Sequence, residues 1–355
     1  MRDIFLRIAS YFYGFAIKMR HKLFDFKFLH SEKFDIPIIC VGNITVGGTG
    51  KTPTVEMLVE HYMHTYNIAV LSRGYGRTTK GYRVVEVDDS YRVVGDEPLQ
   101  IKRKFPNVKV VVCEKRAFAI HRINQEFPDV NLVIMDDGFQ HRYVDPLINI
   151  VIIDANRPIE YDHLLPYGQL RDTEDSLSRA HYFIVTKCPK DMKPIDMRVK
   201  RKRLIQKASQ EIYFSRMQST SPRPIFADVQ HKVSANASVI AMSGIGDNEA
   251  FNKQLESRYN VVATIDLQDH HSYRMSDLHR MEQLLAKYPD AVIMTTEKDA
   301  VKLANSSAIP SSLREKMFFE SISLCFMGDS RAELFAKIDN DIKNMDTEGH
   351  IRGLN

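Results

Sequence analysis

Residues 41–53 read Val41-Gly42-Asn43-Ile44-Thr45-Val46-Gly47-Gly48-Thr49-Gly50-Lys51-Thr52-Pro53, and this glycine-rich stretch decides how the chain folds. The apolar run at 36–40 precedes it and reads as a buried strand. After it, apolar side chains recur at helical spacing, at positions 55, 58, 59 and 62. The order of strand, glycine-rich loop, Lys-Thr and helix predicts a phosphate-binding loop.

The chemistry of such a loop depends on its backbone. Glycines let successive N–H groups turn toward phosphate oxygens, and a helix N-terminus adds partial positive charge. We expect the phosphates to lie on Gly47, Gly48, Thr49 and Gly50. Lys51 then reaches the β- and γ-phosphates, and the Thr52 hydroxyl ligates Mg²⁺. The alternative is a glycine-rich turn that merely precedes Lys-Thr.

The loop departs from the general pattern G-x-x-x-x-G-K-[ST] at one position. Thr45 stands where the pattern requires glycine. We expect Gly47 and Gly48 to supply the flexibility that is lost there.

Composition places bounds on the class of protein. The chain has 355 residues, which predicts about two domains, and its 26% charged residues are ordinary for a globular protein. The net charge of +4 lies within residues 1–30, and the remainder is balanced, unlike a nucleic-acid binder. The four cysteines form no C-x-x-C pair, which argues against a zinc site or a disulfide framework and favours a reducing compartment.

Residues 1–30 combine aromatic side chains with basic ones. Wound as a helix, they place one stripe of mostly polar residues against an apolar, aromatic surface; the stripe contains Asp3, Arg7, Ser10, Gly14, Lys18 and His21. The uncharged run at 8–17 is half of the ~20 residues that span a bilayer. We expect an amphipathic helix that lies on an anionic membrane surface. The alternative is a helix packed on its own domain.

Further candidate residues follow predicted strands. Arg73 and Tyr75 follow the strand at 67–71, where open α/β sheets bind ligands. Asp136 and Asp137 end the strand at 132–135, and an apolar strand that ends in Asp downstream of a phosphate loop predicts the second magnesium-binding element. Arg171 lies in a loop where it is free to meet phosphate.

Residues 82–98 hold one strand pattern and one acidic residue of interest. Valines around Asp88-Asp89-Ser90 predict a hairpin at 82–94. Asp96 then opens a helix, where it acts either as the N-cap or as a general base.

The strand–helix rhythm resumes after a Ser/Pro-rich boundary at 219–224 and ends with a strand within 317–326. We predict an α/β fold: a parallel sheet of the P-loop NTPase type with helices on both faces, and a second, smaller α/β lobe across a cleft. The ranges are 1–30 for the membrane helix, 31–222 for the nucleotide domain with 326–345 as its candidate completion, and 223–325 for the second lobe. His270 and His271 are adjacent, so we expect one of them to handle or orient a proton rather than both to hold a metal.

Taken together, the motifs resemble the tetraacyldisaccharide 4'-kinases of lipid A synthesis. The matching stretches cover most of the chain in the family's order: 42–43 with 46–53, 72–77, 95–98, 136–141, 165–171, 269–270 and 295–300. The family's own loop also lacks glycine at position 45. Tyr167, Gln169 and Asp172 differ from the residues expected there, which leaves the detailed role of that loop open.

The resemblance implies transfer of the γ-phosphoryl group from ATP, with Mg²⁺, to the 4'-hydroxyl of a lipid disaccharide 1-phosphate. It implies an N-terminal docking helix, a peripheral location on the cytoplasmic face of the bacterial inner membrane, and two lobes that close around the nucleotide. ATP as the nucleotide comes from the resemblance alone.

By the same resemblance, Asp96 accepts the proton of the sugar hydroxyl and His270 pairs with it. Mg²⁺ would be held by Thr52, Asp136 and Asp137. The substrate side would include Arg73, Tyr75, Gln140 and His141. Two alternatives remain: a membrane-associated P-loop ATPase or GTPase switch without a lipid acceptor, and a cytosolic small-molecule kinase or ligase.

Overall fold

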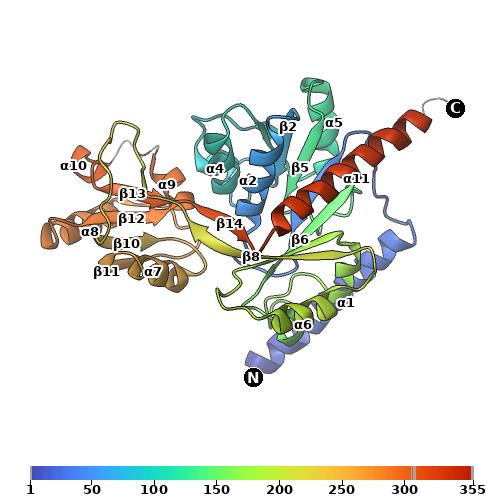
Figure 1. The fold of residues 1–355 in the computed structure, drawn as a ribbon, viewed down its shortest axis with the longest axis horizontal. Helices are drawn as coiled ribbons and strands as arrows, with labels where there is room; N and C mark the ends of the chain where they lie inside the picture. Colours follow the sequence, from blue (N-terminus) through green and yellow to red (C-terminus); the bar gives the residue numbers. More distant parts are fainter. Residues whose placement is uncertain (1, 305, 307–308, 353–355) are drawn as a thin grey trace.

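The computed structural model describes residues 2–304, 306 and 309–352, which form two β-sheets of unequal size (Figure 1). The larger sheet has nine strands in the order β14-β8-β7-β6-β1-β5-β2-β4-β3. Its strands are β1 (Ile38–Gly42), β2 (Ile68–Ser72), β3 (Arg83–Val84), β4 (Lys109–Val112), β5 (Leu132–Asp136), β6 (Ile148–Asp154), β7 (Tyr182–Thr186), β8 (Glu211–Ser219) and β14 (Ile322–Phe326). All neighbours pair in parallel except at the two edges, where β3 and β14 are antiparallel.

Helices cover both faces of this sheet. The helices around it are α1 (Arg2–Asp25), α2 (Lys51–Tyr62), α3 (Tyr91–Val94), α4 (Asp96–Lys104), α5 (Arg116–Glu126), α6 (Pro194–Leu204) and α11 (Ser330–Arg352), with 3-10 helices at Ile159–Tyr161 and Glu174–Arg179. Apolar residues of α2, α4 and α11 pack together on one face of the sheet. Those of α5 pack on the other face, against the alternate residues of the same strands. This confirms the predicted parallel α/β sheet with helices on both faces.

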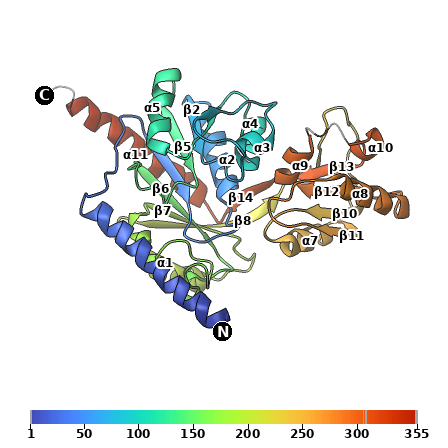
Figure 2. The same cartoon turned by 180° about the vertical axis from the view of Figure 1, so that it is seen from behind.

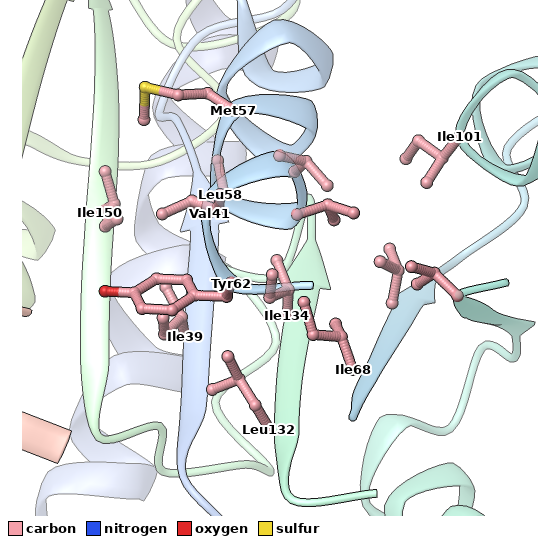
Figure 3. Close-up of a cluster of buried hydrophobic side chains, with 14 of the residues drawn as sticks. Ile39, Val41, Met57, Leu58, Tyr62, Ile68, Ile101, Leu132, Ile134 and Ile150 are labelled. Carbon is pink, nitrogen blue, oxygen red and sulfur yellow. The ribbon is translucent and has the colours of Figure 1, made fainter. Parts of the chain in front are cut away.

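The core explains why the glycine-rich loop is held firmly. Alternate side chains of β1 point to opposite faces, so Ile39 and Val41 meet α2 while Ile38 and Cys40 face the α5 side. Figure 3 shows Leu58 of α2 directly over β1. Because β1 and α2 are both buried, the loop between them is fixed at both ends.

The smaller sheet has five strands in the order β11-β10-β12-β13-β9. Its strands are β9 (Arg223–Pro224), β10 (Ser238–Ser243), β11 (Asn260–Asp266), β12 (Val292–Thr296) and β13 (Met317–Glu320), and its helices are α7 (Asn248–Glu256), α8 (Met275–Lys287), α9 (Glu297–Ala304) and α10 (Ser311–Arg314). This sheet has its own hydrophobic cluster, which contains no residue of the larger sheet.

The chain passes between the sheets through two neighbouring strands. β8 and β14 pair antiparallel, with Ser219 opposite Ile322. One strand is predicted within 317–326, but the structure has two, β13 and β14, which belong to different sheets.

The predicted hairpin at 82–94 is wrong. Arg83 and Val84 do form a short strand, which pairs with β4, but residues 91–94 form the helical turn α3. Ser90 is its N-cap, and the Ser90 hydroxyl accepts the N–H of Arg92 at 3.3 Å. The capping interaction therefore outweighs the strand propensity of the two valines.

The two sheets meet where α4 packs on α9 (Figure 2). Arg103 donates to the carbonyl of Val301 at 2.8 Å, and the Lys104 ammonium lies 3.5 Å from a Glu297 carboxylate oxygen. At the start of α4, Asp96 Oδ2 lies 3.8 Å from Lys302 Nζ of α9, so the whole length of α4 lies beside the smaller sheet.

Candidate active site

The loop between β1 and α2 has the backbone geometry of an anion cradle. Gly47 and Gly50 adopt φ angles of 90° and 100°, which favour glycine. A Cβ on Gly48 would meet no atom within 4 Å, so the loop is open there. α2 begins at Lys51, which directs its first N–H groups toward the same region.

Thr45 has a structural reason to replace glycine. It forms an antiparallel bridge with Leu170, and the neighbouring Arg171 N–H donates to the Ile44 carbonyl at 2.8 Å. An extended backbone of this kind needs no glycine. The same pairing brings Arg171 against the loop.

A cluster of opposite charges lies at the mouth of the loop. Arg171 donates to Asp137 Oδ2 at 2.9 Å, and Lys51 Nζ lies 3.8 Å from Asp137 Oδ1. Burial alone would raise the pKa of Asp137, but the Arg171 hydrogen bond and the Lys51 charge lower it to about 2. Asp137 is therefore an ionised carboxylate.

Asp136 is buried at the end of β5. The Ser72 hydroxyl donates to it at 3.1 Å. Burial and the nearby carboxylates of Glu97 and Asp137 raise the pKa of Asp136 to about 7, against the opposing charge of Lys51. Among Asp96, Asp136 and Asp137, Asp136 is therefore the carboxylate whose ionised form its surroundings stabilise least.

Asp96 occupies the first residue of α4 and is 3% exposed. Gly95 and not Asp96 holds the N-cap position, although Asp96 Oδ1 accepts the first-turn N–H of Glu97 at 3.0 Å. Its Oδ2 lies 2.9 Å from Nδ1 of His270. Burial would raise the pKa of Asp96, but the His270 hydrogen bond and the charge of Lys298 lower it to about 2.

His270 reaches Asp96 from the turn that follows β11 of the smaller sheet. Its φ angle is 57°, an uncommon conformation for a residue other than glycine. The hydrogen bond to Asp96 raises the pKa of His270, and burial opposes the increase. His271 points elsewhere, with Nε2 2.9 Å from Asp277 Oδ2, so the two rings meet different carboxylates.

The phosphate loop and the Asp96–His270 pair belong to one region. A Cβ on Gly95 would lie 3.1 Å from the Cα of Gly74, so the start of α4 packs on the loop after β2. The influence of Glu97 on Asp136 shows the same proximity.

Other predicted residues surround this region. Tyr75 is 64% exposed, and its ring lies 5.0 Å from that of His270. Arg73 is exposed on the same loop, and Thr52 is half-buried in the first turn of α2.

Gln140 and His141 lie in the turn that follows β5, a few residues after Asp136 and Asp137. Gln140 donates to the Asn43 carbonyl at 2.6 Å, so it supports the loop backbone. Burial and nearby arginines, Arg116 foremost, lower the pKa of His141 to about 4. His141 is therefore neutral at physiological pH.

Sequence reasoning assigned no role to Asn43 or Lys298, although both fall within the quoted motifs. Asn43 is buried and donates to the Thr49 hydroxyl at 2.7 Å, which ties the two ends of the loop together. Lys298 lies among the groups that surround Asp96. The available signal for Asn43 was a buried polar residue at the end of a strand. The available signal for Lys298 was a lysine shortly after the buried strand β12.

Helix α1 packs on the protein through Ser10, Gly14 and His21 of its polar stripe, while the rest of the stripe and the aromatic face are exposed. Ser10 donates to the Leu164 carbonyl at 2.7 Å, and His21 Nε2 lies 2.6 Å from Asp172 Oδ1. The outer face consists of large apolar side chains that are 45–77% exposed: Ile4, Phe5, Ile8, Tyr11, Phe12, Phe15 and Met19. The alternative of a helix packed on its own domain is therefore confirmed for one face of α1, and the apolar, aromatic face is exposed. None of the described helices has the length and apolar character needed to cross a membrane.

Comparisons with known proteins identify the family of the chain. The family model described as LpxK, tetraacyldisaccharide-1-P 4'-kinase, matches residues 2–343. The tetraacyldisaccharide 4'-kinase of Phocaeicola vulgatus is 38% identical over 335 residues, 92% of this chain and 91% of that protein. That of Parabacteroides distasonis is 36% identical over 350 residues, 94% of each chain. The crystal structure of LpxK from Aquifex aeolicus in complex with ATP has a TM-score of 0.73 and 26% identity, and covers 97% of this chain and 99% of that one.

Proposed function

The chain belongs to the tetraacyldisaccharide-1-P 4'-kinase family, and we propose that it uses Asp96 as the base when it transfers the ATP γ-phosphoryl group to the 4'-hydroxyl of a tetraacyldisaccharide 1-phosphate. The observation that carries the proposal is the contact between Asp96 and His270 beside the phosphate loop. A base with an orienting partner fits an acceptor hydroxyl. A nucleotide switch without a lipid acceptor leaves this pair unexplained.

The residues present fit ATP and Mg²⁺. The open glycine loop and the start of α2 suit a polyphosphate. Thr52, Asp136 and Asp137 supply the hard oxygen donors that Mg²⁺ prefers, and a bound divalent cation would favour the ionised form of Asp136, which burial disfavours. No group of three or more His, Cys, Asp or Glu side chains within the described ranges is placed to hold a metal by itself, which suits an ion that shares its ligands with phosphates.

In this mechanism the protein positions charge and moves one proton. Bound Mg·ATP supplies an electrophilic phosphoryl group whose negative charge needs neutralisation. Lys51 and Arg171 would stabilise that charge, and Arg171, which donates to Asp137 in the structure, would turn to a phosphate oxygen. Asp96 accepts the proton of the attacking hydroxyl, while His270 orients the Asp96 carboxylate.

We further propose that the two sheets act as two lobes, with the boundaries predicted at 31–222, 223–325 and 326–345 adjusted so that β14 belongs to the larger lobe. His270 then completes the site only when α4 and α9 are in contact. Arg73, Tyr75, Gln140 and His141 line the side from which the lipid acceptor enters.

The exposed aromatic face of α1 supports a peripheral location, which we place at the cytoplasmic face of the bacterial inner membrane. Its apolar side chains suit the acyl boundary of a bilayer, and the basic residues of the segment suit anionic lipid. Binding there presents the active site to a substrate that resides in the membrane.

Replacing Phe12 and Phe15 together with serine is expected to weaken binding to anionic vesicles by about a hundredfold, or about 3 kcal/mol. The two side chains are 66% and 59% exposed, so the unfolding midpoint should not change. Vesicle co-sedimentation measures the affinity. Phe118→Ser removes a phenylalanine that is 48% exposed on α5 and serves as the matched control. Equal binding of both variants and wild type would assign α1 a purely structural role.

The reaction itself is tested with γ-labelled ATP and a bacterial lipid extract. The proposal predicts that label appears in a glycolipid. Label in free phosphate alone would favour the nucleotide switch, and label in a water-soluble product would favour a small-molecule kinase. Either outcome overturns the proposal.

A further inference from the structure

Lys298 of α9 lies at the centre of four functional groups from both sheets. Its ammonium is 3.3 Å from Nε2 of His270, 3.3 Å from Asp269 Oδ1 and 3.6 Å from Glu97 Oε1. It is also 3.7 Å from Asp96 Oδ2. Its side chain is 16% exposed, so little water competes for these contacts. No single one of these groups accounts for its position, because all four surround it at similar range.

The base of this lysine is held rigidly. Asp299 is fully buried and accepts the N–H of Gly244 at 2.9 Å and the hydroxyl of Thr296 at 2.7 Å. These bonds fix the first turn of α9 to the loop after β10. Lys298 therefore projects toward α4 from a fixed point, as a positioning residue requires.

We propose that Lys298 is a positioning residue for phosphoryl transfer, which fixes the tautomer of His270 and thereby orients the Asp96 base. An ammonium group can only donate hydrogen bonds. Nε2 of His270 must therefore accept from Lys298, and the ring proton of neutral His270 lies on Nδ1, where it donates to Asp96. The inference rests on the proposed role of Asp96 as the base.

The charges around Asp96 determine the direction in which the pKa of Asp96 should shift when Lys298 is replaced. The groups that face it are His270, Glu97, Lys298 and Lys302, the last at 3.8 Å. Removal of the Lys298 positive charge favours protonation of its neighbours. The pKa of Asp96 and the pKa of His270 should therefore both rise.

The test compares Lys298→Met, Lys298→Arg and wild type in the full-length protein. We expect the acid limb of the kcat–pH profile of K298M to move upward by about one to three pH units. We expect the His270 titration, followed by NMR of labelled histidine, to move in the same direction. K298R keeps the charge and should restore the wild-type limb. The affinity for ATP should not change, because Lys298 makes no contact with the phosphate loop among those described.

Arg103→Met is the matched control, because Arg103 joins the same two helices through the Val301 carbonyl without touching Asp96. The inference would be overturned if K298M and wild type had the same acid limb and the same His270 titration. It would also be overturned if R103M shifted the acid limb as much as K298M does. Failure of wild type to label any glycolipid would instead overturn the proposed function. If K298M does not fold, an altered acid limb in K298R would contradict a role that depends on charge.

Discussion

Asp96→Asn is expected to lower kcat for lipid phosphorylation by about 10²–10⁴-fold, the contribution typical of a general base. Asparagine preserves the shape of the side chain but cannot take the hydroxyl proton. The carboxylate is buried, held at 2.9 Å from His270, and ionised because its pKa is about 2. Single-turnover assays with γ-labelled ATP measure the loss, and binding of a fluorescent ATP analogue should remain at the wild-type value.

Glu297→Gln is the matched control for this experiment. Glu297 is another largely buried carboxylate at the α4–α9 contact, paired with Lys104 and Arg223, and it has no assigned chemical role. If D96N and E297Q lose activity equally, the effect comes from the interface between the sheets. If D96N keeps the wild-type rate, another group takes the proton.

Lys51→Met is expected to reduce kcat by about 10²–10³-fold, because it removes a preorganised charge where negative charge develops in the transition state. Lys51 begins α2 and approaches both Asn43, at 3.5 Å, and Asp137, at 3.8 Å. Phosphates bound on the glycine loop would replace Asn43 and Asp137 as the partners of the Lys51 ammonium. Steady-state kinetics separate kcat from KM for ATP.

Lys200→Met is the control for Lys51, because Lys200 donates only to the Ala155 carbonyl among the contacts described for it, on the periphery of the same sheet. It should keep wild-type kinetics. A Lys51 variant with unchanged kcat and raised KM would show that the lysine binds ground state and transition state equally, which contradicts the assigned role.

The architecture of the larger sheet follows from apolar runs in the sequence. β6 and β7 are buried along their whole length, and their near-continuous runs of branched side chains are typical of parallel strands covered on both faces. The start of α2 also followed from the glycine loop. These features depend on local pattern, which the sequence shows directly.

The exchange of strands between sheets has no such signal. Residues 317–326 form a mostly apolar run whose polar residues are Glu320, Ser321 and Ser323. Glu320 is buried because it pairs with Arg258, and the chain changes sheets at this point without glycine or proline. Only the ion pair with Arg258, which is distant in the sequence, explains why a glutamate can be buried here.

The site was predictable in its parts but not in its assembly. Lys51, Asp136 and Asp137 follow from a strand–loop–helix rule that acts within one sheet. The approach of Lys298 to Asp96 joins residues 202 positions apart and depends on how α4 packs on α9. Periodicity carries no information about that packing.

The pairing of Ser219 with Ile322 has a consequence for how this fold could be engineered. Residues 220–321 leave and rejoin the larger sheet at adjacent positions, as an inserted domain does when it interrupts a hairpin. A short turn from β8 to β14 would close the nucleotide-binding sheet without this segment. The segment that contributes His270 and Lys298 is therefore, in topological terms, an insertion between two neighbouring strands of the larger sheet.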